Sequence, residues 1–195
     1  MGAFAHGFFN IIDWGKMRTR STLRSQLKEA WKSTIELRYN DQLINSEHGL
    51  QAYFCAELLN EFKDMTRRIF IEPKMSFPNG QRRHPDLVIC DSKSIIGIVE
   101  FKYVPRGRPT HAKDFETLQL AVKHADSLKI SNDRFRGVVA DDRSYSLSPT
   151  AVLCWAAIYT GEAVNLKKSG AGAKLGKHFL QLDATTTKGK NAKVK

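Results

Sequence analysis

The chain has 195 residues, 42% hydrophobic and 26% charged, which is typical of one globular domain. No apolar run approaches the ~18 residues that a membrane-spanning helix needs, so we expect no membrane association. Lysine and arginine number 31 against 20 acidic residues, a net charge of +11. This surplus predicts a polyanionic partner, nucleic acid before a membrane surface, with plain solubility as the alternative.

The N-terminal segment and the cysteines both indicate the cytoplasm. The apolar start of the chain lacks the basic region and the cleavage site of a secretory signal peptide. Cys55, Cys90 and Cys154 are far apart within apolar runs, a spacing that fits neither a disulfide framework nor a zinc site. We expect them to be reduced core residues of a cytoplasmic protein.

Two helices are predicted in the first third of the chain. Residues 16–39 carry apolar side chains at 3-4 spacing, with most basic side chains elsewhere on the helix. This basic helix would either grip nucleic acid or build a homodimer. A second helix is predicted over 46–65, with Asn45 or Ser46 as its N-cap. Its apolar stripe consists of Leu50, Phe54, Leu58, Phe62 and Met65.

After the second helix the hydrophobic period becomes that of strands. Residues 67–77 predict a strand that Pro73 places near an edge or bends. Residues 85–90 and 94–104 are two β-rich runs joined by a short polar segment, Asp91 to Lys93. They predict a hairpin that is apolar on both faces and therefore buried at the centre of a sheet.

The second half of the chain continues the alternation of helix and strand. A basic loop over 105–113 leads into a helix expected to begin at Asp114 as its N-cap, with Val122 on the apolar face. Three later apolar runs follow: 135–140 and 177–182, expected as strands, and 151–159, expected as strand or helix. This order predicts an α/β domain with a mixed central sheet flanked by helices.

We divide the chain into three parts on this basis. Residues 1–45 form an N-terminal helical extension, residues 46–182 form the main domain, and residues 183–195 form a basic, flexible tail.

One group of residues has the types and the spacing expected of a catalytic site. Asp86 follows a proline, and thirteen residues later comes Glu100-Phe101-Lys102. Glu100 and Lys102 lie in a strand pattern, where residues two apart face the same side. The other acid-x-lysine tripeptides of the chain lie in a helix, across a proline or in a turn.

A hairpin that folds about Lys93 places Asp86 opposite Glu100 and Cys90 opposite Ile96. Cross-strand Cβ atoms lie about 5 Å apart, so the two carboxylates repel each other unless a cation lies between them or one takes a proton. A hard divalent ion with oxygen ligands, Mg²⁺ first, is the natural occupant.

A third acid is predicted to join this pair from the second helix. Glu47 falls in the middle of the apolar stripe of that helix, so its side chain should face the sheet. We favour a role beside the metal over the alternative of a first-turn acid that interacts with the helix dipole. Gln51 flanks the same stripe and would support the site.

These residues resemble the motif of the PD-(D/E)xK nuclease superfamily, which has the restriction-endonuclease-like fold. Pro85, Asp86, Glu100 and Lys102 carry the resemblance, with Glu47 at the position of a helix acid found in many members. It covers roughly residues 46–140, and the motif is short, so its strand–turn–strand context carries much of the weight.

The resemblance implies hydrolysis of phosphodiester bonds in DNA by metal-activated water. It implies that Asp86, Glu100, the Phe101 carbonyl and Glu47 hold Mg²⁺, with Mn²⁺ as a substitute. Lys102 would orient the attacking water and stabilise the charge of the transition state. The preference for DNA over RNA comes from the resemblance alone.

Several further residues have two open interpretations. His84 is either a phosphate contact or a strand-end residue, and Gln119 either supports the site or lies on the surface. Four residues of the basic loop are expected to contact the nucleic-acid backbone, with plain solvation as the alternative: Arg106, Arg108, His111 and Lys113.

Two rival functions belong to other classes. One is a non-catalytic protein that binds nucleic acid or a protein partner on the same fold, and the other is a basic adaptor with a purely structural hairpin. The presence of every acid of the motif, and of Lys102, favours the enzyme.

Overall fold

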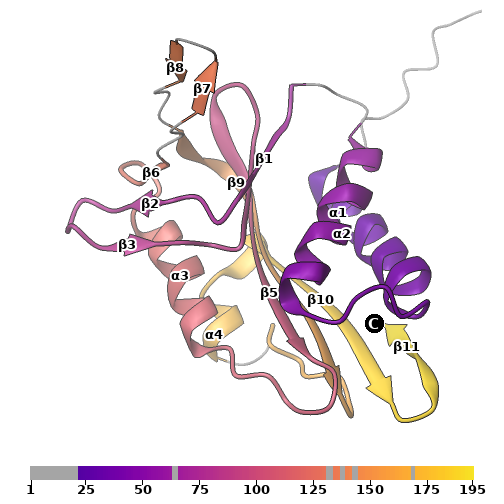
Figure 1. Ribbon diagram of the computed structural model, residues 1–195. Helices are drawn as coiled ribbons and strands as arrows, with labels where there is room; N and C mark the ends of the chain where they lie inside the picture. The colour runs from indigo at the N-terminus through magenta and orange to yellow at the C-terminus, as the bar shows by residue number, and fades with distance from the viewer. Residues whose placement is uncertain (1–21, 63–65, 131–133, 137–138, 142–144, 168–169) are drawn as a thin grey trace, which may run out of the picture.

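The computed structural model describes residues 22–62, 66–130, 134–136, 139–141, 145–167 and 170–195. Its centre is a six-stranded mixed sheet with helices on both faces (Figure 1), which confirms the predicted fold class. The strands pair in the order β1-β4-β5-β9-β10-β11. Their bounds are β1 Arg68–Ile71, β4 Leu87–Cys90, β5 Ser94–Val104, β9 Ser146–Thr160, β10 Phe179–Thr187 and β11 Lys190–Val194.

The helices and short strands lie around this sheet. On one face are α1 Leu23–Ser33, the π-helix η1 Thr34–Tyr39 and α2 Glu47–Glu61. On the other is α3 Ala112–Lys123, with the short α4 Gly170–Ala173; the 3-10 turn η2 Gly176–His178 precedes β10. The small sheets contain β2 Met75–Ser76, β3 Arg82–Arg83 and β6 Lys129–Ile130, and β7 Arg134–Arg136 and β8 Val139–Asp141.

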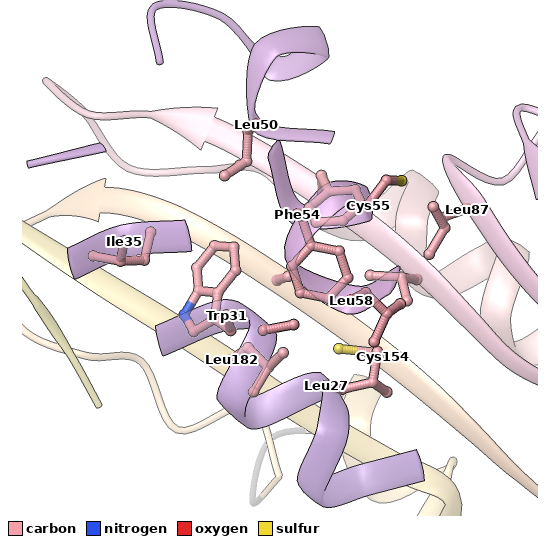
Figure 2. Close-up of a cluster of buried hydrophobic side chains, with 14 of the residues drawn as sticks. Leu27, Trp31, Ile35, Leu50, Phe54, Cys55, Leu58, Leu87, Cys154 and Leu182 are labelled. Carbon is pink, nitrogen blue, oxygen red and sulfur yellow. The ribbon is translucent and has the colours of Figure 1, made fainter. Parts of the chain in front are cut away.

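Each face of the sheet has its own hydrophobic core, because successive strand residues point to opposite faces. On the α1 and α2 side, Trp31 packs edge-on against Phe54 (Figure 2), which packs in the same way against Phe101 of β5. On the α3 side, Phe115 and Leu118 pack in the cluster that contains Trp155 of β9. The two cores fix both helical layers to one sheet.

The cysteines are buried in these two cores, as predicted. Cys55, Cys90 and Cys154 are all free, and burial raises the pKa of each thiol. A raised pKa keeps a thiol neutral and unreactive, which fits a packing role.

The two predicted N-terminal helices are present, with shifted ends. The apolar positions of the first helix are buried from Leu27 to Ile35, while residues 16–21 lie outside the described residues. The second begins at Glu47, where the Ser46 hydroxyl accepts a hydrogen bond from the Gly49 N–H at 3.1 Å. It ends at Glu61, before the predicted end. The buried side chains from Leu27 to Ile44 lie in the same core as those of the second helix and the sheet.

The hairpin of β4 and β5 has the predicted register at its open end. Val88 pairs with Ile98, and the same register places Asp86 level with Glu100. Every residue of β4 is buried, as expected for a central strand.

A bulge corrects the predicted register at the closed end of this hairpin. Cys90 pairs with Ile95 and not with Ile96. The Asp91 carboxylate accepts hydrogen bonds from the backbone N–H groups of Lys93 and Ser94 at 2.8 and 2.7 Å. These bonds tighten the turn, and the bulge takes up the extra residue without moving the acids.

The strand predicted over 67–77 is two strands, β1 and β2, with the edge position and the bend at Pro73 that the sequence predicts. The chain leaves β1 at Glu72, whose φ of 46° is left-handed, and Pro73 follows directly. A left-handed residue before a proline cannot continue a ladder, so the chain turns out of the main sheet and enters the small one as β2.

Two later runs also differ in detail. Residues 135–140 do not form one strand, because β7 and β8 pair with each other as a separate hairpin. Residues 151–159 lie within the strand β9, which pairs in parallel with β5 and β10 and settles the strand-or-helix alternative. The predicted strand at 177–182 is present as the first part of β10.

The predicted flexible tail is wrong, since residues 183–195 are ordered strands. β10 continues to Thr187 and turns at Lys188 and Gly189, where Gly189 has a φ of 72°. β11 then pairs back along β10 and buries Ala192. A tight hairpin turn commonly needs positive φ, which glycine adopts without steric cost.

Candidate active site

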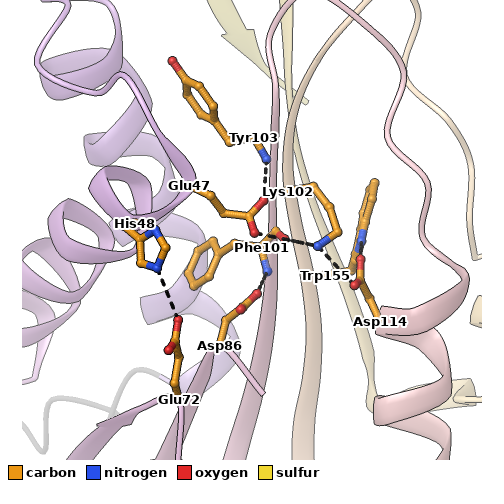
Figure 3. A network of polar contacts seen from close by, with 9 residues as sticks. All are labelled: Glu47, His48, Glu72, Asp86, Phe101, Lys102, Tyr103, Asp114 and Trp155. Carbon is orange, nitrogen blue, oxygen red and sulfur yellow. Dashed lines mark hydrogen bonds and ion pairs between the residues drawn. The ribbon is translucent and has the colours of Figure 1, made fainter. Parts of the chain in front are cut away.

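The candidate site lies where β5 continues past the end of β4. Within the described ranges, the edge of β5 beyond Val99 has no strand partner on this side, so its N–H groups need other acceptors. Asp86 Oδ2 accepts a hydrogen bond from the Phe101 N–H at 2.6 Å, and Glu47 Oε2 accepts one from the Tyr103 N–H at 3.0 Å (Figure 3). Two of the three predicted acids therefore cap the free edge of this strand.

The third acid, Glu100, lies against Asp86 in a buried position. Glu100 is 6% exposed, and among the residues that the structure describes its Oε1 has no hydrogen-bond partner. Burial raises the pKa of Glu100 to about 9, and the charges of Asp86 and Asp114 add to the rise. Burial also raises the pKa of Asp86, against the hydrogen bond from Phe101. Without a cation, Glu100 therefore holds a proton at neutral pH, as the predicted repulsion requires.

Lys102 extends from the same face of β5 as Glu100, as the strand period predicts. Its Nζ donates to the Phe101 carbonyl at 2.9 Å and lies 3.2 Å from Asp114 Oδ1 and 3.9 Å from Glu47 Oε1. Burial lowers the pKa of Lys102, but the charges of Asp114, Glu47 and Asp86 outweigh it and raise the pKa overall. The ammonium is therefore firmly charged and held in one place.

Asp114 is a site residue that the sequence interpretation missed. The helix begins at Ala112, so Asp114 lies inside its first turn and is not the N-cap. The carboxylate is buried, with Oδ1 on Lys102 and Oδ2 accepting from the Trp155 indole N–H at 3.1 Å. Asp114, Leu118 and Ala121 share helical spacing and are all buried. The helical-wheel argument that predicted Glu47 to face the sheet would therefore have predicted the same for Asp114.

The same helix corrects one apolar position. Val122 was expected on the buried face, but it is 37% exposed, and Ala121 is buried in its place. Phe115 and Leu118 of the predicted stripe are buried, so the prediction fails only at the last turn of the helix.

The oxygen donors of Asp86 and Glu100 fit a hard divalent cation. The buried Glu100 Oε1 without a partner is the observation that favours this fit. Within the described ranges, no three or more His, Cys, Asp or Glu side chains are grouped to hold a metal. Mg²⁺ is usually held by one or two carboxylates together with water and substrate phosphates, so a pair is sufficient.

The other two predicted ligands are engaged elsewhere. Glu47 faces the sheet, as predicted, but its carboxylate binds the Tyr103 N–H and approaches Lys102. The Phe101 carbonyl accepts the Lys102 ammonium. Their roles as ligands stay predictions, and what the structure gives them is the positioning of β5 and of Lys102.

Four of the five predicted nucleic-acid contacts are exposed: His84, Arg106, Arg108 and Lys113. The His84 ring lies 3.4 Å from the Glu72 carbonyl. Arg108 donates to the Glu162 carbonyl at 2.7 Å and lies over the Tyr159 ring.

His111 packs edge-on against Phe115 and Trp155, so its ring belongs to the α3 core. The two supporting glutamines also lie apart from each other: Gln51 is buried within α2, and the Gln119 amide donates to the Ala171 carbonyl at 3.2 Å. The structure thus brings together Glu47, Asp86, Glu100, Lys102 and Asp114. Among the described residues, no hydrogen bond or ion pair joins either glutamine to this group.

Comparisons with known proteins add little to this geometry. The chain matches no protein-family model and no curated protein. A structural similarity is found to E. coli MS115-1 NucC in its cAAA-bound form, with a TM-score of 0.40 and 8% sequence identity over 96% of this chain and 85% of that one. We draw neither fold nor function from a similarity at this level. In the described part of the chain, no helix is long and apolar enough to cross a membrane.

Proposed function

We propose that the protein is a Mg²⁺-dependent nuclease of the PD-(D/E)xK type that hydrolyses phosphodiester bonds in DNA. The observation that carries the proposal is the pair of the half-buried Asp86 and the buried Glu100, beside a charged lysine on the same face of the sheet. Among the described residues, Glu100 Oε1 has no hydrogen-bond partner. Such a group is costly to keep in a fold, and perturbed carboxyls in this arrangement are typical of functional sites.

Each of these residues would have its own role in the proposed reaction. Asp86 and Glu100 would hold the metal ion, which supplies an acidified water and neutralises phosphate charge. Lys102 would hold its ammonium against the attacked phosphate or the incoming water. Asp114 and Glu47 would keep that ammonium in position, and the Glu47 bond to Tyr103 would fix the end of β5.

DNA is proposed as the substrate because of the family resemblance and the net charge of +11. The three free, buried cysteines fit a reducing compartment, and we propose the cytoplasm. A homodimer stays a prediction from the basic N-terminal helix.

Digestion of a supercoiled plasmid with and without Mg²⁺ tests the proposal. Wild type should nick or linearise the plasmid only with Mg²⁺ or Mn²⁺, and Lys102→Ala should be about 10²–10³-fold slower. Asp86→Ala should abolish cutting, and Asp86→Asn, which keeps an oxygen for the Phe101 N–H, should do the same with the fold intact.

Glu29→Gln, on the exposed surface of α1, is the matched control and should cut as wild type does. If the wild type binds DNA yet cuts no substrate with either metal, the protein is the non-catalytic binding protein and the proposal is wrong.

A further inference from the structure

A groove of about 1210 Å³ opens beside the candidate site, at the edge of the sheet where three parallel strands end. Its lining includes Tyr103, Thr160 and Thr186, which lie at or near the C-terminal ends of β5, β9 and β10. Those ends meet at the bottom of Figure 1, where the hairpin of β10 and β11 turns. Open α/β sheets bind ligands at this edge of their strands.

The groove is joined to the site through Glu47. One oxygen of this carboxylate holds the Tyr103 N–H at 3.0 Å, and the other lies 3.9 Å from the Lys102 ammonium. The groove lining and the candidate site therefore share the end of β5, where Tyr103 of the lining directly follows Lys102 in the chain.

The charge of the groove has one sign. Arg106, Lys188 and Lys190 line it, and all three are exposed. Of the described residues that line it, none is an aspartate or a glutamate. The remaining polar lining is neutral: Tyr39, Asn40, Gln42, Asn45, Thr160, Thr186, Thr187 and Asn191. Exposed cations beside a neutral lining match a phosphodiester backbone.

The walls of the groove are fixed to one another before any ligand binds. The Asn40 side chain accepts from the Ala192 N–H at 2.8 Å and donates to the Ala192 carbonyl at 3.4 Å, which ties β11 to η1. The Thr186 hydroxyl donates to the Pro105 carbonyl at 2.6 Å, which ties β10 to the basic loop. A cleft that is already assembled loses little entropy on binding.

We propose that this groove holds the backbone of the DNA strand that leads to Lys102, and that the tip of the β10–β11 hairpin is a DNA-binding element. The proposal rests on the proposed function for the identity of the ligand. It gives the C-terminal lysines a defined place, since the turn at Gly189 presents Lys188 and Lys190 on either side of the hairpin tip.

The test is the binding of a short fluorescein-labelled DNA duplex, followed by anisotropy in EDTA so that no cutting occurs. The double variant Lys188→Ala/Lys190→Ala should bind about 10-fold more weakly, and the slope of log K against log salt should fall by about 2. Arg106→Ala, on a separate element, should lower the same slope by about 1.

The matched control is Lys93→Ala/Lys177→Ala, which removes the same charge from two exposed lysines near the opposite ends of β5 and β10. It should bind as wild type does, and thermal unfolding should show all variants folded. Unchanged binding by both groove variants, or equal weakening by the control, would overturn the groove. A wild type that binds through the groove but never cuts DNA would overturn the nuclease and leave the groove standing.

Discussion

Replacing Glu100 by glutamine should stabilise the protein in the absence of metal. Glu100 is buried beside Asp86, and its pKa is raised to about 9. In the described part of the chain its Oε1 has no hydrogen-bond partner. The unfolded chain loses this proton near pH 4.5, so the folded chain holds a proton that the unfolded chain has released. The contribution of Glu100 to the free energy of unfolding is fully present below pH 4.5 and is lost as the pH rises toward 9. Glutamine has the same shape and does not titrate.

The size of the effect follows from the two pKa values. At pH 7 the group is about 2.5 units above its unfolded pKa, and each unit corresponds to about 1.36 kcal/mol, so the cost to wild type is about 3 kcal/mol. The figure is an upper bound, because the adjacent Asp86 shares the titration. For a chain of this length it corresponds to a rise in Tm of roughly 6–12 °C.

The assay is thermal unfolding in EDTA at several pH values between 5 and 9 for wild type, Glu100→Gln and the control Glu29→Gln. The gap between wild type and Glu100→Gln should widen as the pH rises, while the exposed Glu29→Gln should stay within about 0.5 kcal/mol of wild type. Adding Mg²⁺ should raise the Tm of wild type and not that of Glu100→Gln.

A Glu100→Gln variant that is less stable than wild type at pH 8 would refute the reasoning. That result would mean that the ionised carboxylate makes favourable contacts in the folded chain, and that the pair is not a site held ready for a cation.

Three further changes test other parts of the structure. Asp114→Asn should slow cleavage about 10-fold. It should also move the alkaline limb of the pH–rate profile to lower pH, because Lys102 loses the neighbouring charge that raises its pKa. An alkaline limb at the wild-type pH would contradict the ion pair. Phe54→Ala should cost about 3–5 kcal/mol in denaturant unfolding, and a loss under 1 kcal/mol would contradict the packed core around Trp31. Deleting 188–195 should cost about 2–4 kcal/mol because it removes the β11 ladder, whereas a flexible tail could be removed without effect.

The fold and the site were predictable where a signal is local and periodic. The hairpin of β4 and β5 was predictable because two apolar runs flank a three-residue polar turn. The register of this hairpin is enough to place Asp86 opposite Glu100. Glu47 was predictable because a helical wheel places it among buried residues. In both cases one short stretch of sequence contains the whole signal.

The misses arose where a local signal competes with a tertiary one. Asp114 has the residue type of an N-cap, and this local signal hid the helical spacing that it shares with the buried Leu118 and Ala121. Its contacts with Lys102 and Trp155 place it in the site. The lysines of β11 made this segment look like a flexible tail. Its one buried residue, Ala192, is small and gives little apolar signal for a strand. The bulge at Cys90 leaves no mark in the sequence, because it depends on how the turn at Asp91 closes.

Counting bound Mn²⁺ by electron paramagnetic resonance tests the proposed metal site at Asp86 and Glu100. Titration of wild type with Mn²⁺ should reveal a bound cation that Mg²⁺ displaces, and Asp86→Asn and Glu100→Gln should each lose it while remaining folded. If both variants bind Mn²⁺ as wild type does, the two carboxylates do not hold the metal, and the catalytic role proposed for them is wrong.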